Sequence, residues 1–359
     1  MKEKSELTGV KEIARRAKVS IATVDRVIHN RTGVSLKTKE KIEQIIADLK
    51  YQPNIFAQRL ASRKVVEFAV LLPQVPEDNN YWQAPLDGIL QAEKEVEPFG
   101  IKITRYLFDH GDEASFARLC RQILKSKVNG VLLAPLFINE TIRFIHACHR
   151  LGIPYVFIDS DIPNQDRLCY IGPDLFQSGY LGGHLLSFGA TDKGKVLILN
   201  ISGDIGLTKE MEDQHRLIRK EEGIRTYFEK NNRSNEILKM DMKQTDYASI
   251  KKKLAKILSD NTGITAICVT NSRVSSVARY LKEENIKNIF LVGFDFTNEN
   301  VAYLENGLIN FIICDRPQEQ GYRGIISLYQ SLVLGLKVEH DYYMPIDIIT
   351  KENYIFYRN

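Results

Sequence analysis

The 359-residue sequence lacks the long apolar run and the paired cysteines that mark whole classes of protein. No window approaches the ~18 continuous apolar residues of a membrane span, so we expect no membrane partner. The first nine residues, MKEKSELTG, contain no apolar run, so we expect no secretory signal peptide and a cytoplasmic location. The five cysteines are scattered without a CxxC pair, which is typical of reduced thiols in a cytosolic protein.

Motifs for catalysis, cofactors and metals are also missing. The sequence contains no GxxxxGK[ST], GxSxG or HExxH motif and no GxGxxG after a predicted strand. Cys148 and His149, with His146 nearby, match no ligand spacing of a metal site. We therefore expect neither an enzyme nor a protein that binds a cofactor or a metal.

Positive charge is concentrated at one end of the chain. Residues 1–64 carry 15 Lys and Arg against 7 Asp and Glu, a formal balance of +8, whereas the whole chain balances at +4. The remaining residues therefore balance at −4. This asymmetry favours a nucleic-acid-binding head on an ordinary body, although a basic surface that only aids solubility produces the same count.

Three short amphipathic helices are predicted between Val10 and Leu49, where apolar residues recur at the i, i+3, i+4 spacing of one helix face. Ser20 and Ser35 are suited to cap the second and third helices, because their hydroxyls accept free backbone N–H groups. Only residues 18–20 separate the first two helices, which predicts a helix-turn-helix corner. A basic unit of this kind places one helix in a DNA groove, so we predict DNA binding.

Short apolar runs alternate with helical patterns from residue 65 onward. Such near-continuous apolar strands favour parallel sheets covered by helices on both faces. The strand–helix units are more numerous than one sheet usually contains, so we predict two α/β subdomains. The predicted strands are 65–72, 101–108, 130–135, 153–159, 195–201, 236–242, 264–270, 289–295 and 309–315. The predicted helices lie around 83–98, 112–126, 139–151, 174–189, 210–230, 246–260, 272–285 and 317–335.

Several predicted strands end in a polar residue. Ligands of open α/β sheets bind beyond the carboxyl ends of the strands, so these side chains are candidates for a binding cleft. Asp and Asn also favour turns and helix N-caps, and any single one has that simpler explanation. Together they favour a cleft: Asp159, Asn200, Asn271, Asp295 and Asp315.

The segment from Val10 to Lys64 resembles the DNA-binding head of the lac repressor/galactose repressor (LacI/GalR) family. It contains the A-x-x-A-x-V-S-x-x-T-V-x-R-V core, Asn30, the V-S-x-x-T-x-x-K-I start of the third helix, and Y-x-P-N before A-x-x-L-A. The remaining chain is similar to the periplasmic-sugar-binding-protein-like sensor of that family. The resemblance implies an α/β sensor of two doubly wound parallel-sheet subdomains, of periplasmic binding protein type I, behind an all-α head.

The resemblance also implies the domain limits. Residues 1–53 are expected to form the helix-turn-helix domain, 54–63 a hinge helix that orders on operator DNA, and 64–359 the effector-binding sensor. Within the sensor, the N-subdomain is expected at about 64–172 and 316–343, and the C-subdomain at about 173–315 and 344–359.

The DNA contacts come from the same resemblance. Arg26 is expected to read a guanine edge, and Ile21 and Ala22 to make apolar groove contacts. Leu60 is expected to be an apolar wedge in the minor groove. The implied DNA-binding residues are Ser20, Ile21, Ala22, Thr23, Arg26, Asn30, Asn54, Ala57, Leu60 and Ala61.

Two positions depart from the family pattern. Lys18 occupies a turn position where Gly is commonest, and a left-handed backbone there costs up to about 1 kcal/mol. Asp25 stands where the family usually has Ser. A carboxylate facing DNA repels phosphates or accepts from a cytosine amino group, so Asp25 bears on the operator sequence.

For the sensor, the resemblance implies a carbohydrate-like effector held between the subdomains. Aromatic faces suit the C–H faces of a sugar, while carboxylates and amides bind its hydroxyls. The implied contacts are Asn80, Tyr81, Trp82, Asp159, Asn271, Asp295, Asp315, and either Arg219 or Lys220. Trp82 has a second interpretation as a core or interface aromatic. Ser160 stands where sugar-binding relatives often have Arg, which leaves the particular sugar open.

We therefore predict a ligand-controlled transcription regulator, a repressor, whose homodimer binds a near-palindromic operator. Effector binding is expected to close the subdomains and change operator affinity. A transport-type sugar receptor is a second hypothesis, disfavoured by the basic head. An enzyme acting on a small polar metabolite is a third, disfavoured by the missing motifs.

Overall fold

The computed structural model describes residues 9–28, 31–49, 51, 65–76, 79–201 and 216–358. The chain divides into two compact units, Met1–Arg63 and Lys64–Asn359. Among the described residues, no helix is long and apolar enough to cross a membrane.

The first unit contains the predicted helices, α1 (Val10–Ala17), α2 (Ile21–Ile28) and α3 (Leu36–Asp48). Their apolar faces form one small core, whose buried members are Ile13, Ala14, Ala17, Val24, Val27 and Ile42. Lys18 ends α1 in the left-handed region, with φ 57° and ψ 44°, so the chain adopts this turn without a glycine.

Side chains also complete the ends of these helices. Ser20 Oγ accepts a hydrogen bond from Thr23 N at 3.1 Å, and Ser35 Oγ accepts one from Thr38 N at 3.3 Å. Both serines therefore cap a helix, as predicted. Lys41 Nζ donates to Ala17 O at 2.9 Å and so joins α3 to the C-terminal end of α1.

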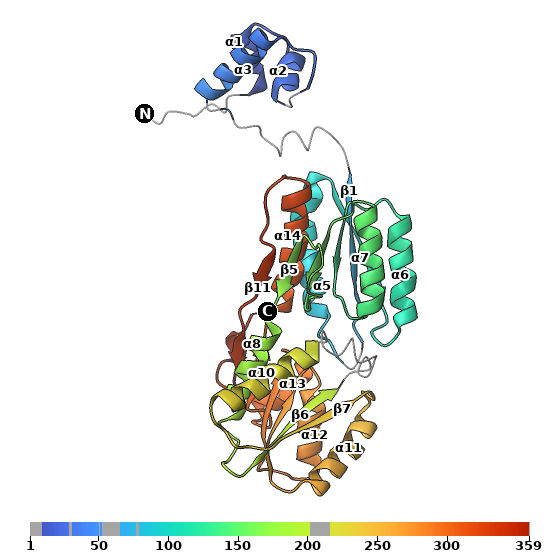
Figure 1. Cartoon of the computed structure of the whole chain (residues 1–359), viewed down its shortest axis with the longest axis vertical. Coiled ribbons are helices and arrows are strands. Elements are labelled where there is room, and N and C mark those ends of the chain that lie inside the picture. Colours follow the sequence, from blue (N-terminus) through green and yellow to red (C-terminus); the bar gives the residue numbers. More distant parts are fainter. Residues whose placement is uncertain are drawn as a thin grey trace. The chain divides into compact units, whose positions relative to one another are not determined.

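The second unit is built from two six-stranded sheets, each with helices on both faces (Figure 1). The first has the order β11-β5-β4-β3-β1-β2 and the second the order β12-β10-β9-β8-β6-β7. The strands of the first are β1 (Val66–Pro73), β2 (Ile101–Phe108), β3 (Gly130–Leu133), β4 (Tyr155–Ile158), β5 (Cys169–Gly172) and β11 (Asp341–Tyr343). Those of the second are β6 (Lys195–Ile201), β7 (Ile237–Met242), β8 (Ile264–Val269), β9 (Phe290–Phe294), β10 (Phe311–Cys314) and β12 (Asp347–Ile349).

The helices accompany their sheets as separate groups. With the first sheet lie α5 (Gln83–Val96), η1 (Glu97–Phe99), α6 (Glu113–Lys125), α7 (Ile138–Arg150) and α14 (Pro317–Leu332). With the second lie α8 (Leu175–Leu186), α10 (Arg216–Lys230), α11 (Tyr247–Asp260), α12 (Val274–Glu283), α13 (Asn298–Glu305) and η2 (Tyr354–Phe356). Along β6, Val196 and Ile198 join one core while Leu197 and Leu199 join another, because successive side chains point to opposite faces. This explains why central strands such as β6 and β8 are apolar at nearly every position.

The predicted fold class is confirmed, and the differences concern short elements. The strands β5, β11 and β12 and the helix α13 were not predicted. Strands of three or four residues carry too few side chains to display a period. The strand β12 also runs antiparallel to β10, so the second sheet is not purely parallel.

The chain passes between the two halves three times: between β5 and α8, between β10 and α14, and between β11 and β12. Each half is therefore discontinuous in sequence. The predicted limits of the subdomains and of the hinge remain predictions.

Each half also contains a pair of helices in very close contact. A Cβ atom on Gly88 of α5 would lie 1.8 Å from Gln318 O of α14, and one on Gly179 of α8 would lie 1.9 Å from Lys220 O of α10. Real atoms do not approach so closely, so these contacts require glycine. The second pair positions α10, which carries Lys220.

Candidate functional site

The exposed face of α2 is the candidate DNA-binding surface. Val24 and Val27 face the core, which leaves Ile21, Ala22 and Arg26 exposed. Ile21 is 50% exposed, an unusual position for a large apolar side chain in so small a unit. The same geometry that buries one face of the helix thus presents these three side chains together.

Two contacts shape this surface. Arg31 donates to Asp25 Oδ2 at 3.0 Å, so the carboxylate that departs from the family pattern is paired with a cation. A Cβ atom on Gly33 would lie 2.9 Å from a terminal nitrogen of Arg26, so the Arg26 guanidinium lies against this glycine. Ser20 and Thr23 also share a hydroxyl–hydroxyl bond of 2.9 Å. The predicted contacts Asn30, Asn54, Ala57, Leu60 and Ala61 lie outside the described residues.

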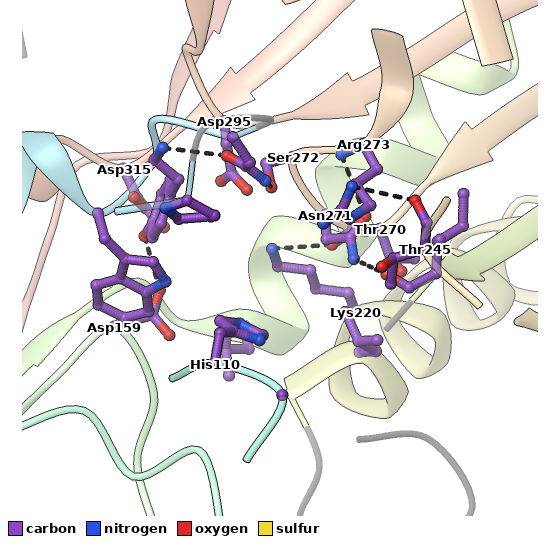
Figure 2. A pocket seen from close by; sticks show the side chains of 18 of the residues that line it. His110, Asp159, Lys220, Thr245, Thr270, Asn271, Ser272, Arg273, Asp295 and Asp315 are labelled. Atoms are coloured by element: carbon purple, nitrogen blue, oxygen red, sulfur yellow. Dashed lines mark hydrogen bonds between the residues drawn. The ribbon is translucent and has the colours of Figure 1, made fainter. Parts of the chain in front are cut away.

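The candidate effector site is a cavity of about 300 Å³ between the two sheets, at the carboxyl ends of their strands (Figure 2). Residues from both halves line it. Of the predicted contacts, the cavity brings together Tyr81, Trp82, Asp159, Lys220, Asn271, Asp295 and Asp315. Asn79 Nδ2 donates to Ser272 Oγ at 2.6 Å, and this bond joins the first half to the second beside the cavity.

The other predicted contacts lie elsewhere. Asn80 does not line the cavity, and its Oδ1 accepts from Asn298 N at 3.4 Å. Arg219 is 46% exposed, pairs with Glu222 and lies over the Phe176 ring, also away from the cavity. The side chain that lines the cavity is therefore Lys220.

Lys220 is buried, at 6% exposure. Its ammonium donates to Thr270 O at 3.2 Å and lies 4.0 Å from the centre of the Phe294 ring. A carbonyl oxygen and an aromatic face both stabilise a desolvated cation. The Lys220 ammonium thus keeps donor capacity for a ligand.

Asp159 and Asp295 each follow a strand directly and adopt left-handed backbone conformations, with φ 70° and 72°. Such angles are uncommon outside glycine, and aspartate tolerates them better than most residues. Tyr81 Oη donates to Asp159 Oδ1 at 2.6 Å. Burial, together with the nearby carboxylates Asp159, Asp315 and Asp295, raises the pKa of Tyr81 well above its usual value, so its hydroxyl stays a donor.

A buried amide links Asp159 of one half to Asp315 of the other. Gln320 of α14 is 1% exposed, and its Oε1 accepts from Asp159 N at 2.9 Å. Its Nε2 donates to Asp315 O at 2.9 Å and to Asp315 Oδ1 at 3.1 Å. Gln320 therefore holds the end of β4 beside the end of β10.

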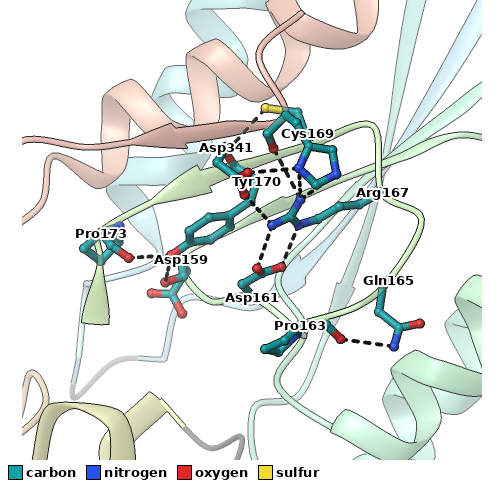
Figure 3. A network of polar contacts seen from close by, with 10 residues as sticks. Asp159, Asp161, Pro163, Gln165, Arg167, Cys169, Tyr170, Pro173 and Asp341 are labelled. Atoms are coloured by element: carbon teal, nitrogen blue, oxygen red, sulfur yellow. Dashed lines mark hydrogen bonds and ion pairs between the residues drawn. The ribbon is translucent and has the colours of Figure 1, made fainter. Parts of the chain in front are cut away.

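A second polar network supports the loop that begins at Asp159 (Figure 3). Arg167 binds both carboxyl oxygens of Asp161 at 2.7 Å and donates to Asp341 Oδ1 at 2.6 Å. Tyr170 Oη donates to Pro173 O at 2.8 Å. A buried arginine shared by two carboxylates fastens this loop to the edge strand β11.

Several lining residues were not predicted. They follow strands, as the predicted ones do, and the principal ones are Asp109, His110, Thr245, Ser272 and Arg273. Asp109 comes directly after β2, so the rule that singled out Asp159 also applied to it. Gln320 lies within a helix, where the sequence has no such signal.

Comparisons with known proteins identify the two parts of the chain. Residues 9–54 match the family of bacterial regulatory proteins called the lacI family, and residues 68–335 match the periplasmic binding protein domain. The chain belongs to the lacI family of bacterial regulators. It is a DNA-binding transcriptional regulator with a periplasmic binding protein-like sensor, as predicted.

Individual relatives align with most of this chain. The sucrose operon repressor of Lactococcus lactis subsp. lactis is 24% identical over 343 residues, or 94% of this chain and 98% of the relative. A crystal structure assigned to a LacI transcriptional regulator from Bacteroides fragilis is 27% identical, with a TM-score of 0.75, and covers 82% of this chain and 100% of its own. A glucose-galactose binding protein from Geobacillus stearothermophilus is 22% identical, with a TM-score of 0.70 and coverage of 81% and 99%. The last likeness concerns the fold alone.

Proposed function

We propose that this regulator is a repressor whose operator affinity is controlled by a sugar or sugar derivative bound in the sensor cavity. The observation that carries the proposal is the lining of the cavity, where Trp82 lies beside Asp159, Asn271 and Asp295. An aromatic face with convergent carboxylates and amides suits a polyhydroxylated ring. The names of the sucrose operon repressor and the glucose-galactose binding protein are consistent with such a ligand.

The cavity also suggests how the ligand acts. Its polar groups come from both halves, so a ligand that binds them all stabilises the closed arrangement of the halves. A ligand shifts the operator-bound population only by the difference between its affinities for the two arrangements. We propose that this difference is transmitted to the head through the hinge at 54–63.

At the operator, we propose that α2 enters the major groove. Arg26 would read a guanine, Ile21 and Ala22 would contact the bases, and Ser20 and Thr23 would hold phosphates. A homodimer would place two heads on the half-sites of a near-palindromic operator. The chain would then act as a binding protein and not as an enzyme or a transport receptor.

The experiment that tests the effector uses the single tryptophan. The full-length protein is titrated with monosaccharides, sugar acids and sugar phosphates while Trp82 fluorescence is recorded. We expect a saturable change with one class of compound, and we expect that compound to change operator affinity in a gel-shift assay. Saturable binding without any change in operator affinity would contradict the control by effector but not the binding.

A further inference from the structure

Acidic and basic side chains lie on opposite sides of the cavity. Figure 2 shows Asp159, Asp295 and Asp315 on one side, with Lys220 and Arg273 across from them. Both cationic side chains are also engaged with backbone oxygens, Lys220 with Thr270 O and Arg273 with Thr245 O. The three carboxylates thus lie opposite the two cationic side chains across the cavity (Figure 2).

Asp315 is a buried carboxylate with a single hydrogen-bond partner for its side chain among the described residues. It is 9% exposed, and its one side-chain hydrogen bond with another described residue comes from Gln320 Nε2. The orientation of this amide follows from the donors around it. Since Asp159 N can only donate, the Gln320 oxygen must face Asp159 and its NH2 group must face Asp315. The partner of Asp315 is thus neutral.

No lysine or arginine forms an ion pair with Asp315 in the part of the chain that the structure describes. The neighbouring Arg316 pairs with Asp347 instead, at 2.7 Å. One oxygen of a buried carboxyl group that lines the cavity is therefore left for the ligand. A buried carboxylate is stable only when it is paired or protonated.

The electrostatic balance at Asp315 agrees with this geometry. Burial, followed by Asp295 and Asp159, raises the pKa of Asp315 to about 7, although Lys220 acts in the opposite direction. A ligand cation beside Asp315 would supply the missing charge and favour the ionised form. An anionic ligand, such as a sugar phosphate or a sugar acid, would add to the repulsion.

We propose that the effector is an amino sugar whose protonated amine binds beside Asp315 and Asp295. The sugar ring would lie against Trp82, and its hydroxyls would bind Asn271 and Lys220. This inference rests on the proposed control by a sugar-like effector, and it specifies the charge of that effector.

The test compares amines with neutral sugars of the same shape. Full-length protein is titrated by calorimetry with glucosamine, galactosamine and mannosamine, each beside its parent hexose and its N-acetylated form. We expect one amine to bind about tenfold to a hundredfold more tightly than its parent hexose, because a hydrogen bond to an ionised group is worth about 1.5–3 kcal/mol. N-acetylation removes the charge and is expected to abolish the advantage.

Two variants locate the effect. Asp315→Asn is expected to abolish most of the preference for the amine while the parent hexose still binds. Asp260→Asn, a change of the same chemistry at an exposed position on α11, is expected to leave every affinity unchanged. The ratio in the wild-type protein is decisive even where Asp315→Asn fails to fold.

The outcomes distinguish an effector without an amine from a protein that binds no sugar. A parent hexose that binds as tightly as its amine would overturn this inference and leave the sugar effector standing. If a sugar acid or a sugar phosphate bound most tightly, this inference would likewise be overturned, and the sugar effector would again stand. If no sugar binds, with or without an amine, both the inference and the proposed sugar effector are wrong.

Discussion

The exposed face of α2 and the sensor cavity differ in where they keep their polar groups. Arg26 reaches into solvent from a helix whose other face packs on a small apolar core. Asp315 and Lys220 are buried, at 9% and 6% exposure, and come from distant parts of the sequence. The proposed DNA-binding surface thus lies on a single helix, whereas the cavity is assembled from many strand ends.

This difference bears on energetics. Exposed charges are solvated and screened, so the head holds its proposed DNA-binding residues at little cost in stability. Buried carboxylates are desolvated, and this desolvation lowers the stability of the folded sensor without ligand. We propose that ligand binding relieves that penalty and shifts the arrangement of the two halves. We therefore expect substitutions in the cavity to change stability, and substitutions on α2 to change affinity.

The largest expected effect is the pH dependence of the sensor. Because the folded-state pKa of Asp315 is about 7 and its ordinary value is 3.8, the unfolded chain releases this proton first as the pH rises. This group's contribution to stability is therefore full below about pH 4, falls between about pH 4 and pH 7, and is lost above that range. The shift corresponds to an upper limit of about 4 kcal/mol, at 1.36 kcal/mol per pH unit.

Urea denaturation at several pH values measures this effect. Asp295, Asp159 and Lys220 also face Asp315, so the informative quantity is the difference between the wild-type protein and Asp315→Asn. We expect the wild-type protein to lose stability relative to the variant between pH 4 and pH 7. A difference that does not change with pH would mean that Asp315 ionises normally.

The second effect tests whether cavity residues depend on helix packing. Gly179→Ala would place a Cβ 1.9 Å from Lys220 O, so we expect a loss of roughly 3 kcal/mol and weaker effector binding. Gly182→Ala, in the same helix, meets its nearest atom at an ordinary 3.6 Å and is expected to be neutral or stabilising. Thermal unfolding of both variants gives the comparison, and equal melting temperatures would contradict the close packing of α8 on α10.

The third effect is a change in operator affinity without a change in the stability of the head. Arg26→Ala is expected to reduce affinity for an operator selected from random duplexes by about 1–3 kcal/mol and to relax the preference at one base pair. Arg15→Ala removes an exposed arginine that pairs with Glu12 on α1, and is expected to have a much smaller effect. If Arg26→Ala retained the full operator preference, the assignment of α2 as the recognition helix would be wrong.

The smallest effect is a difference in operator affinity between variants of two serines that both cap a helix. Ser20→Ala and Ser35→Ala each remove a helix cap, so we expect each to destabilise the head by about 1 kcal/mol. Ser20 is also proposed to hold a phosphate, so Ser20→Ala alone is expected to weaken operator binding beyond the loss of stability. Equal operator affinities for the two variants at a temperature where both are folded would remove Ser20 from the DNA contacts.

Much of the fold was predictable because its signals are local. The i, i+3, i+4 spacing located α1, α2 and α3, and the caps at Ser20 and Ser35 marked where two of them begin. The long apolar strands were equally clear, since burial on both faces leaves few polar positions. The short strand β5 and the edge strands β11 and β12 had no such pattern, and pairing with neighbouring strands is what makes them strands.

The sites divide in the same way. By itself, the sequence determined which residues of α2 face away from the core and which residues follow the long strands, because both depend on positions only a few residues apart. Only the tertiary structure decided that Lys220 lines the cavity and Arg219 does not, and that Gln320 joins Asp159 to Asp315. Those contacts depend on the order of strands in two sheets and on the three crossings between them, and no local pattern encodes distances between residues so far apart in the chain.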